Sequence, residues 1–237
     1  MLNLNHLPFY DIEASDKLTI IKPFAPAIGK IRLPQSLIDD FNADIDDPKS
    51  KKEDWSERLV GKVKQEALIN TEIIQPHAKF FSDCALNYIA DYAAHHCYPF
   101  HKNTKPQITI TAAWFVSQMQ NEFNPAHVHI NGELSCIGYL KVPDGIEDEW
   151  ADDGLDHHPS RGHVEFVHGT PSILSKTMFT VRPRVGDFYI FPSDLIHMVY
   201  PFQTVGERRS FSMNILINEE KPAVQTQQKE LTPDGDK

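Results

Sequence analysis

The sequence has few cysteines, no long apolar run and no excess of positive charge, and each shortage argues against a class of protein. The three cysteines are scattered over 237 residues without a Cys-x-x-Cys pair, which disfavours a disulfide framework and a cysteine-based zinc site. No run of about eighteen apolar residues occurs, and residues 1–10 lack a basic-then-apolar signal pattern. The formal net charge of −10 disfavours binding to a phosphate backbone. We therefore expect a cytoplasmic protein without a membrane or nucleic-acid partner.

Helical periodicity is confined to the first half of the chain. After Pro34, apolar residues at helical spacing predict a short amphipathic helix that ends in the acidic run of residues 44–47. From Pro76 to Cys97, apolar residues recur every three or four positions, and a proline suits the first turn of a helix. We expect this second helix to pack on the outside of a sheet.

From Gln107 onward the pattern changes to short β-rich segments separated by Pro, Gly and Asn turns. The predicted strands are residues 108–111, 113–116, 134–142, 163–167, 178–181, 187–191 and 211–217. Helices followed by strands predict an α+β domain, in which a barrel or jelly roll is supported by a helix on one face. We divide the chain into α/β elements at 1–105 and a β core at 106–218, which form one domain, and a tail at 219–237 that we expect to be disordered.

Three histidines are the first candidate site. His127 and His129 are two positions apart, so their side chains point to the same side of a strand. Turn signals at 124–125 and 131–132 flank the pair and place it at the rim of a sheet, and His197 is expected at the start of a later strand. Two neighbouring ligands and one distant ligand suit a metal held inside a β-barrel. The alternative is a set of histidines on a solvent-facing surface.

A second polar group is expected on the strand that follows His197. In strand geometry Arg208 and Ser210 share one face with the polar residues at 212 and 214, while the apolar residues between them share the other face. A polar face inside a barrel is costly unless a polar ligand satisfies it. An arginine fork beside a hydroxyl is a good receptor for a carboxylate. A solvated strand face is the alternative.

Together these residues resemble the 2-oxoglutarate- and Fe(II)-dependent oxygenases, and in particular a group whose first metal motif reads His-x-His. The resemblance covers residues 114–218 and rests on His127-x-His129, Leu134-Ser135, Tyr139-Leu140, the segment from Gly186-Asp187 to His197, and Arg208-Arg209-Ser210. It implies a double-stranded β-helix, a jelly-roll or cupin-like barrel, with supporting helices from the N-terminal half.

The resemblance also implies a chemistry and a role for each residue. His127, His129 and His197 would be the catalytic ligands of Fe(II). Arg208 and Ser210 would hold the distal carboxylate of the cosubstrate 2-oxoglutarate, with a further contact from the Tyr139 hydroxyl. The expected reaction couples decarboxylation of 2-oxoglutarate to succinate with oxidation of a second substrate, typically its hydroxylation. That substrate would be a small molecule or a protein side chain.

One position departs from the family pattern, because most relatives have a carboxylate where this chain has His129. Glu133 and Asp194 could supply that carboxylate, and we rank both below His129. His127, His129 and Glu133 also match the first metal motif of cupins, so a cupin-type dioxygenase or isomerase that does not use 2-oxoglutarate is the alternative function. A binding module without enzymatic activity is a third hypothesis. Arg208 separates the first two, since a cupin acting without 2-oxoglutarate has no need of it.

The acidic segment from Glu147 to Arg161 is predicted to be a long loop. A loop of that length is commonly a functional lid. Its six acids would suit a polar or basic substrate, although a solvated charged loop is an equal alternative. The oligomeric state and the identity of the substrate stay open at this level.

Overall fold

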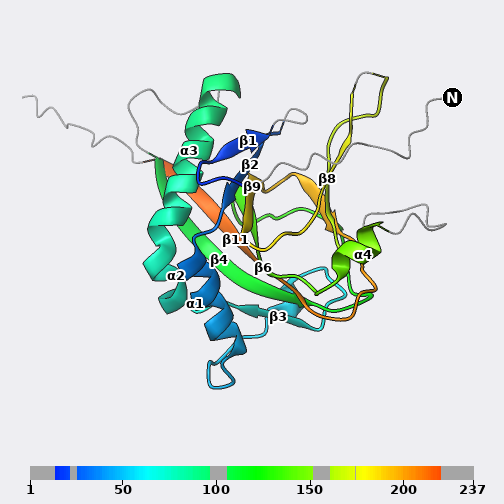
Figure 1. Ribbon diagram of the computed structural model, residues 1–237. Helices are drawn as coiled ribbons and strands as arrows, with labels where there is room; N and C mark the ends of the chain where they lie inside the picture. The colour runs from blue at the N-terminus through cyan, green and yellow to red at the C-terminus, as the bar shows by residue number, and fades with distance from the viewer. Residues whose placement is uncertain (1–13, 22–25, 97–105, 152–160, 174, 220–237) are drawn as a thin grey trace, which may run out of the picture.

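Two antiparallel sheets packed face to face, with helices on the outer side of the larger sheet, form the computed structural model (Figure 1). The structure describes residues 14–21, 26–96, 106–151, 161–173 and 175–219. The predicted tail after Glu219 and residues 152–160 of the acidic segment lie outside these ranges, as does Cys97. Within them, no helix is long and apolar enough to cross a membrane.

The larger sheet has seven strands in the order β1-β2-β9-β6-β11-β4-β3. Their bounds are β1 (Thr19–Ile21), β2 (Ile28–Arg32), β3 (Gln65–Leu68), β4 (Pro106–Gln118), β6 (Leu134–Lys141), β9 (Asp187–Pro192) and β11 (Arg208–Glu219). The long strands β4 and β11 pair over almost their whole length. β-branched and aromatic residues make up more than half of β4, and such residues fit a pleated, half-buried surface. The segments predicted at 108–111 and 113–116 form one strand, β4, and the strands predicted at 134–142, 187–191 and 211–217 are confirmed.

The smaller sheet has four strands in the order β5-β10-β7-β8. Their bounds are β5 (Asn124–His127), β7 (Val164–Val167), β8 (Met178–Val181) and β10 (Ile196–Val199). β5 pairs antiparallel with β10, and His127 lies directly opposite His197 in that pairing. The sheet register therefore joins two residues that are far apart in the sequence.

The helices are α1 (Gln35–Asp46), α2 (Thr71–Ile74), α3 (Ala78–His96) and α4 (Ile146–Ala151), with single 3-10 turns at Ser56–Arg58 and Gln75–His77. Both predicted helices are present as α1 and α3. The loop predicted at 147–161 is wrong for its first part, which forms α4. Three acids lie in the first turn of α4, where negative charge is favoured by the helix dipole.

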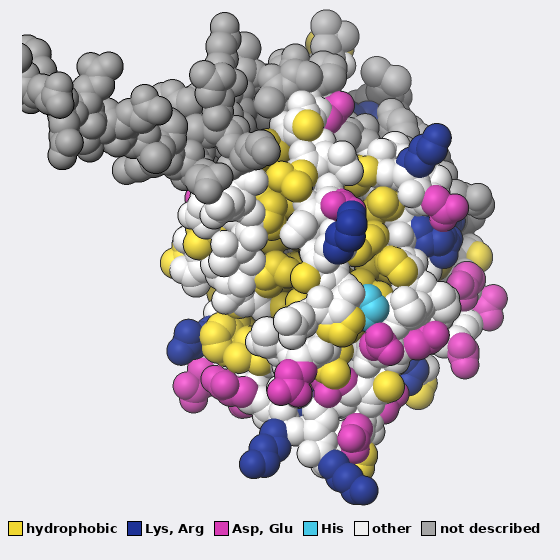
Figure 2. Space-filling view, turned by 90° about the vertical axis from the view of Figure 1, so that its left-hand side faces the viewer, with side chains coloured by type: hydrophobic (Ala, Val, Ile, Leu, Met, Phe, Trp, Pro, Cys, Tyr) yellow, Lys and Arg dark blue, Asp and Glu magenta, His cyan; other side chains and the backbone are white. Residues whose placement is uncertain are grey.

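The apolar side chains form two layers, one on each face of the larger sheet. The outer layer lies between the sheet and α1–α3 and contains Phe41, Phe81, Phe188 and Phe211 in edge or tilted contact. The inner layer lies between the two sheets. Burying one such ring removes enough apolar surface to stabilise the fold by roughly 2–3 kcal/mol. Figure 2 shows the helical face, where acidic side chains gather in the lower half.

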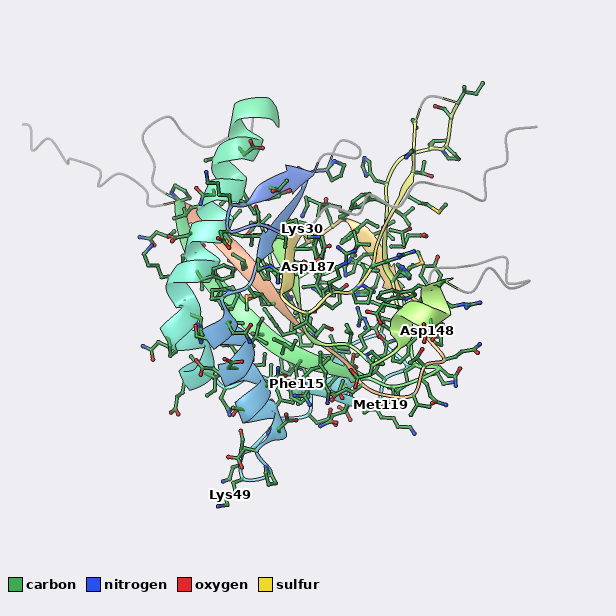
Figure 3. The ribbon with its side chains drawn as sticks, viewed as in Figure 1. Lys30, Lys49, Phe115, Met119, Asp148 and Asp187 are labelled. Carbon is green, nitrogen blue, oxygen red and sulfur yellow. The ribbon has the colours of Figure 1, made fainter. Side chains whose placement is uncertain are left out.

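An ion pair crosses the larger sheet between β2 and β9. Lys30 Nζ lies 2.8 Å from Asp187 Oδ2, and both side chains are almost fully buried (Figure 3). The Tyr189 hydroxyl donates to the same carboxylate at 3.1 Å. Removing either partner alone would leave an uncompensated buried charge and destabilise the fold where β2 pairs with β9.

Candidate metal centre and carboxylate pocket

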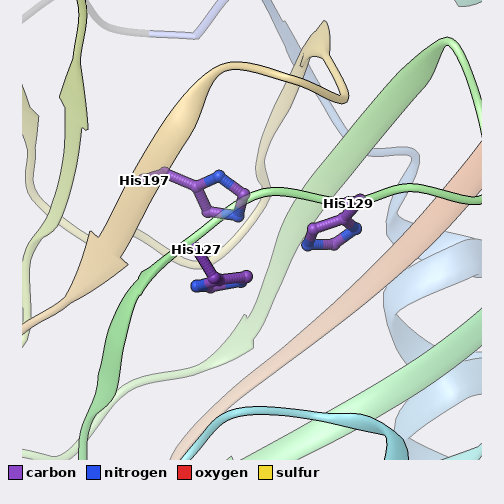
Figure 4. Close-up of side chains that lie close together, drawn as sticks. All are labelled: His127, His129 and His197. Carbon is purple, nitrogen blue, oxygen red and sulfur yellow. The ribbon is translucent and has the colours of Figure 1, made fainter.

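The structure brings the three predicted histidines together between the two sheets (Figure 4). His127 ends β5, His129 follows it, and His197 is the second residue of β10. One ring nitrogen from each histidine lies within 4.8 Å of those of the other two. In the described ranges this is the single cluster of three His, Cys, Asp or Glu side chains at such spacing.

The ring nitrogens are oriented by hydrogen bonds. His127 and His197 each place Nδ1 against the backbone carbonyl two residues earlier, at 2.8 and 2.9 Å. His129 places Nδ1 2.7 Å from the carboxamide oxygen of Asn214. Since each acceptor carries no proton, we assign the hydrogen to Nδ1 in all three rings. The Nε2 lone pairs are then available, and acceptors that contact Nδ1 in this way select the same tautomer in metal sites.

The electrostatic environment keeps these rings neutral. Burial lowers the pKa of His127 and of His129 below the usual value. Burial, together with the two neighbouring imidazoles, lowers the pKa of His197 to about 3. At neutral pH the cluster therefore offers neutral imidazoles, the form that binds a metal.

Asn214 connects His129 to a buried polar chain. Its carboxamide oxygen also accepts from the Ser135 hydroxyl at 3.2 Å, and Ser135 lies 3.0 Å from the Ser193 hydroxyl. The Ser193 carbonyl accepts from the backbone N–H of His129 at 2.8 Å. The register of β4 against β11 shifts between Asn214 and Ile215, and such irregularities commonly re-aim side chains beside sites. The role of Asn214 was missed from the sequence, although its place on the polar face of the strand was predicted.

Arg208 and Ser210 line the same pocket as the three histidines. The rest of the wall is mostly apolar, with a few polar side chains; it comprises Leu59, Val60, Trp114, Val116, Gln118, Asn124, Cys136, Ile137, Val164, Phe191, Val199 and Ser212. The alternation of polar and apolar side chains along β11 explains why Arg208 and Ser210 line the pocket. Its odd-numbered apolar residues lie in the outer layer, while its even-numbered polar residues face the pocket. The predicted division of this strand into two faces is confirmed.

Arg208 is buried, with 1% of its surface exposed. It donates to the Gln118 carboxamide oxygen at 3.0 Å and to the Tyr139 hydroxyl at 3.3 Å, and its guanidinium lies 4.9 Å from the centre of the Tyr139 ring. Its Nε has no hydrogen-bond partner, and no carboxylate of the described chain pairs with it. A buried cation without an anionic partner is unfavourable, so this end of the pocket favours an anionic ligand.

The neighbouring Arg209 belongs to the opposite face of β11. It donates to Asp46 at 2.6 Å, to Glu207 at 2.8 and 2.9 Å and to Asn42 at 2.9 Å. These contacts tie the sheet to the end of α1. Arg209 is thus already paired outside the pocket, whereas Arg208 is not.

The two alternative carboxylates lie outside the histidine cluster. Glu133 is exposed and accepts from the backbone N–H of Ile217 at 2.8 Å. Asp194 is also exposed. The described part of the acidic segment does not line the pocket either, since Glu149 accepts hydrogen bonds from the backbone of Gln203 instead.

Two facing antiparallel sheets that enclose three metal-type ligands define a double-stranded β-helix. Residues 112–214 match a family described as "Putative 2OG-Fe(II) oxygenase". That range contains all six residues predicted for the site. Over this range, which is less than half of the chain, the sequence is therefore similar to the 2-oxoglutarate- and Fe(II)-dependent oxygenases.

Two solved structures with TM-scores of 0.50 or more support the fold. The chain is similar to the non-haem α-ketoglutarate-dependent carbocyclase SnoK from nogalamycin biosynthesis, with 12% identity, 79% of each chain covered and a TM-score of 0.51. It is similar to the epimerase SnoN of the same biosynthesis, with 12% identity, 79% of this chain and 75% of that chain covered, and a TM-score of 0.50. The chain is also similar to a Pseudomonas putida prolyl-4-hydroxylase, with 14% identity, 79% of this chain and 91% of that chain covered, and a TM-score of 0.49. No curated protein matches the chain in sequence.

Proposed function

We propose that the protein is an Fe(II)- and 2-oxoglutarate-dependent oxygenase and that its reaction is a hydroxylation. One observation carries the proposal: three neutral histidines and a buried arginine without a carboxylate partner share one pocket. Three imidazoles on one side of a metal leave further positions open for other ligands, and imidazole suits iron. The donor set therefore fits Fe(II), and the arginine fits a carboxylate.

Each residue has a distinct part in this reaction. His127, His129 and His197 would hold Fe(II), which when bound supplies the activation of oxygen coupled to decarboxylation of 2-oxoglutarate to succinate. Arg208 would bind the distal carboxylate, and its contact with the Tyr139 hydroxyl fixes the guanidinium plane. Ser210 would add a hydroxyl contact, while the apolar wall excludes water from the reacting groups.

The function is tested by adding 2-oxoglutarate to the Fe(II)-loaded protein without oxygen. We expect a weak visible charge-transfer band, followed on admission of oxygen by formation of succinate. 2-oxovalerate, which has the same chain length without the distal carboxylate, serves as the control and should give a much weaker response. A protein that binds iron but gives neither band nor succinate would contradict the proposal.

A cupin-type dioxygenase or isomerase is the second candidate. The observation that favours it is the absence of a carboxylate from the described cluster of three histidines. Such an enzyme would bind Fe(II) or Mn(II) with no thermal stabilisation from 2-oxoglutarate. A binding module would gain stability from neither ligand, so one thermal-shift series separates the three hypotheses.

The substrate is proposed to be a small molecule or a protein side chain. SnoK and SnoN are described as a carbocyclase and an epimerase, so this fold carries reactions other than hydroxylation. Hydroxylation therefore needs a test of its own, which is the incorporation of oxygen into a product, measured by mass spectrometry.

For the domain arrangement we propose one unit from the N-terminal elements to β11, because α1 and α3 share the outer apolar layer with the sheet.

Asn214 supplies a prediction about metal affinity. Asn214→Ala removes the acceptor that holds His129 Nδ1, and loss of such an outer-shell contact typically weakens metal binding about 10–100-fold. Asn214→Asp keeps an acceptor at the same place and should retain or tighten binding. Titration of both variants with Mn(II) measures the difference. Equal metal affinities in the two variants would contradict this role.

A further inference from the structure

A buried carboxylate close to the pocket has no part in the proposed reaction. Glu66 lies on β3, where it pairs directly with Val116 of β4. Side chains of directly paired residues share one face of a sheet, and Val116 lines the pocket. Glu66 therefore extends to the pocket side of the sheet rather than toward the helices.

The Glu66 carboxyl lies directly behind the pocket wall. A Cβ built on Gly61 would lie 3.2 Å from Glu66 Oε1 and 2.7 Å from Asn124 Oδ1. Gly61, Glu66 and Asn124 therefore lie close together, and they can do so because Gly61 has no side chain. Asn124 lines the pocket together with Val60, which is 54% exposed. The carboxyl is therefore separated from the pocket by the Asn124 carboxamide and a short stretch of chain at the mouth.

Glu66 has no cation to balance it. Its side chain is 2% exposed, and neither carboxylate oxygen makes a hydrogen bond of ordinary geometry in the described structure. Glu122 is also buried, and among the described residues its carboxylate accepts from the backbone N–H of Met119 alone, a residue labelled in Figure 3. Buried carboxylates are normally paired. Neither side chain lines the pocket itself, and Glu122 lies close enough to Glu66 to raise its pKa. Two buried carboxylates without a cation among the described residues therefore lie behind this wall of the pocket, and a positive group bound at the wall would balance them.

The acidity of Glu66 agrees with this geometry. Burial raises the pKa of its carboxyl to about 7, the Asn124 carboxamide lowers it, and the carboxylates of Glu122 and Asp54 raise it again. A cation placed beside Glu66 would offset both the burial and the repulsion.

We propose that Glu66 and Glu122 form a recognition subsite for a cationic group of the substrate, an ammonium or a guanidinium that enters beside Asn124. The substrate class is then an amine- or guanidine-bearing molecule whose cation is held at the β3–β5 edge while its other end reaches toward the histidines. This proposal rests on the proposed function in one respect, namely that the pocket is the substrate site. The cation itself would be bound by side chains of the protein, without the metal or 2-oxoglutarate.

The test is equilibrium binding without turnover. Nα-acetyl-L-arginine amide and its neutral counterpart Nα-acetyl-L-citrulline amide are titrated by calorimetry into the protein loaded with Mn(II) and 2-oxoglutarate under nitrogen. We expect the arginine derivative to bind at least about tenfold more tightly, the scale of one charge-assisted contact. Glu66→Gln should abolish that preference. Glu57→Gln removes an exposed acid of the neighbouring 3-10 turn and should leave the preference intact.

Two results would overturn the proposal: equal binding of the charged and neutral probes by the wild-type protein, or a preference that survives in Glu66→Gln. Failure here is distinguishable from failure of the proposed function. Succinate formation with no charge preference removes only the cation subsite, whereas a charge preference in a protein that forms no succinate removes only the oxygenase.

A stability measurement shows that Glu66→Gln remains folded. Because the pKa of Glu66 is raised to about 7 in the folded protein, the wild-type protein loses stability as the pH rises from about 4.5 through 7, where the folded state must ionise a buried acid. Glutamine carries no such penalty. The Tm of the variant should exceed that of the wild-type protein by a few degrees at pH 8 and by less at pH 5.

Discussion

Replacing His197 by alanine is expected to lower the affinity for a divalent metal by more than about a hundredfold. Removing a residue that only contacts a metal ligand typically weakens metal binding about 10–100-fold. His197 would supply a lone pair to the metal directly, so its loss should weaken binding further. Its ring is held between His127 and His129, with ring centroids 4.3 and 5.1 Å away, so no other side chain of the described cluster can take its place.

The measurement is a Mn(II) or Co(II) titration of the purified variant, followed by calorimetry. His168→Ala is the matched control, because His168 is exposed just after β7 of the same sheet and lies outside the cluster. That variant should bind metal as the wild-type protein does. Unchanged affinity in His197→Ala would remove the metal centre from this position. Loss of affinity in both variants would assign metal binding to exposed histidines.

The sequence alone predicts the parts of the site that depend on local alternation. Arg208 and Ser210 could be assigned to one face of a strand because polar and apolar residues alternate from Ser210 to Ile215. The i, i+2 spacing of His127 and His129 likewise predicts a common direction, and the break before His197 predicts a strand start. In each case the physical cause lies within a few residues of the side chain concerned.

What depends on the register between strands could not be predicted. Asn214 contacts His129 because β11 shifts register against β4 at that residue, and no local pattern encodes such a shift. The contacts of Arg209 with Asn42 and Asp46 of α1 likewise depend on packing between distant elements. Glu66 lies on a strand of four residues, too short for its alternation to distinguish an inward from an outward side chain. The α4 helix was missed since it is six residues long, below the length at which periodicity is informative.

Arg208→Met is expected to weaken the binding of 2-oxoglutarate by about 2–5 kcal/mol, the range for removing one partner of a buried, hydrogen-bonded charge pair. Methionine fills a similar volume, and the variant no longer buries a cation without an anionic partner. The fold should therefore be retained or stabilised. Metal affinity should be unchanged, because Arg208 contacts Gln118 and Tyr139 and none of the three histidines.

The decisive comparison is between two ligands and two variants. In calorimetry with the Mn(II) protein, 2-oxoglutarate should lose its advantage over 2-oxovalerate in Arg208→Met, while the affinity for 2-oxovalerate changes little. Ser210→Ala should reduce the same advantage by only about 0.5–1.5 kcal/mol, the net contribution of one neutral hydrogen bond. If Arg208→Met weakened both ligands equally, the arginine would be shaping the pocket rather than binding the distal carboxylate. If Arg208→Met weakens only the binding of 2-oxoglutarate, the charge of Arg208 binds the distal carboxylate, since the two ligands differ only at that group.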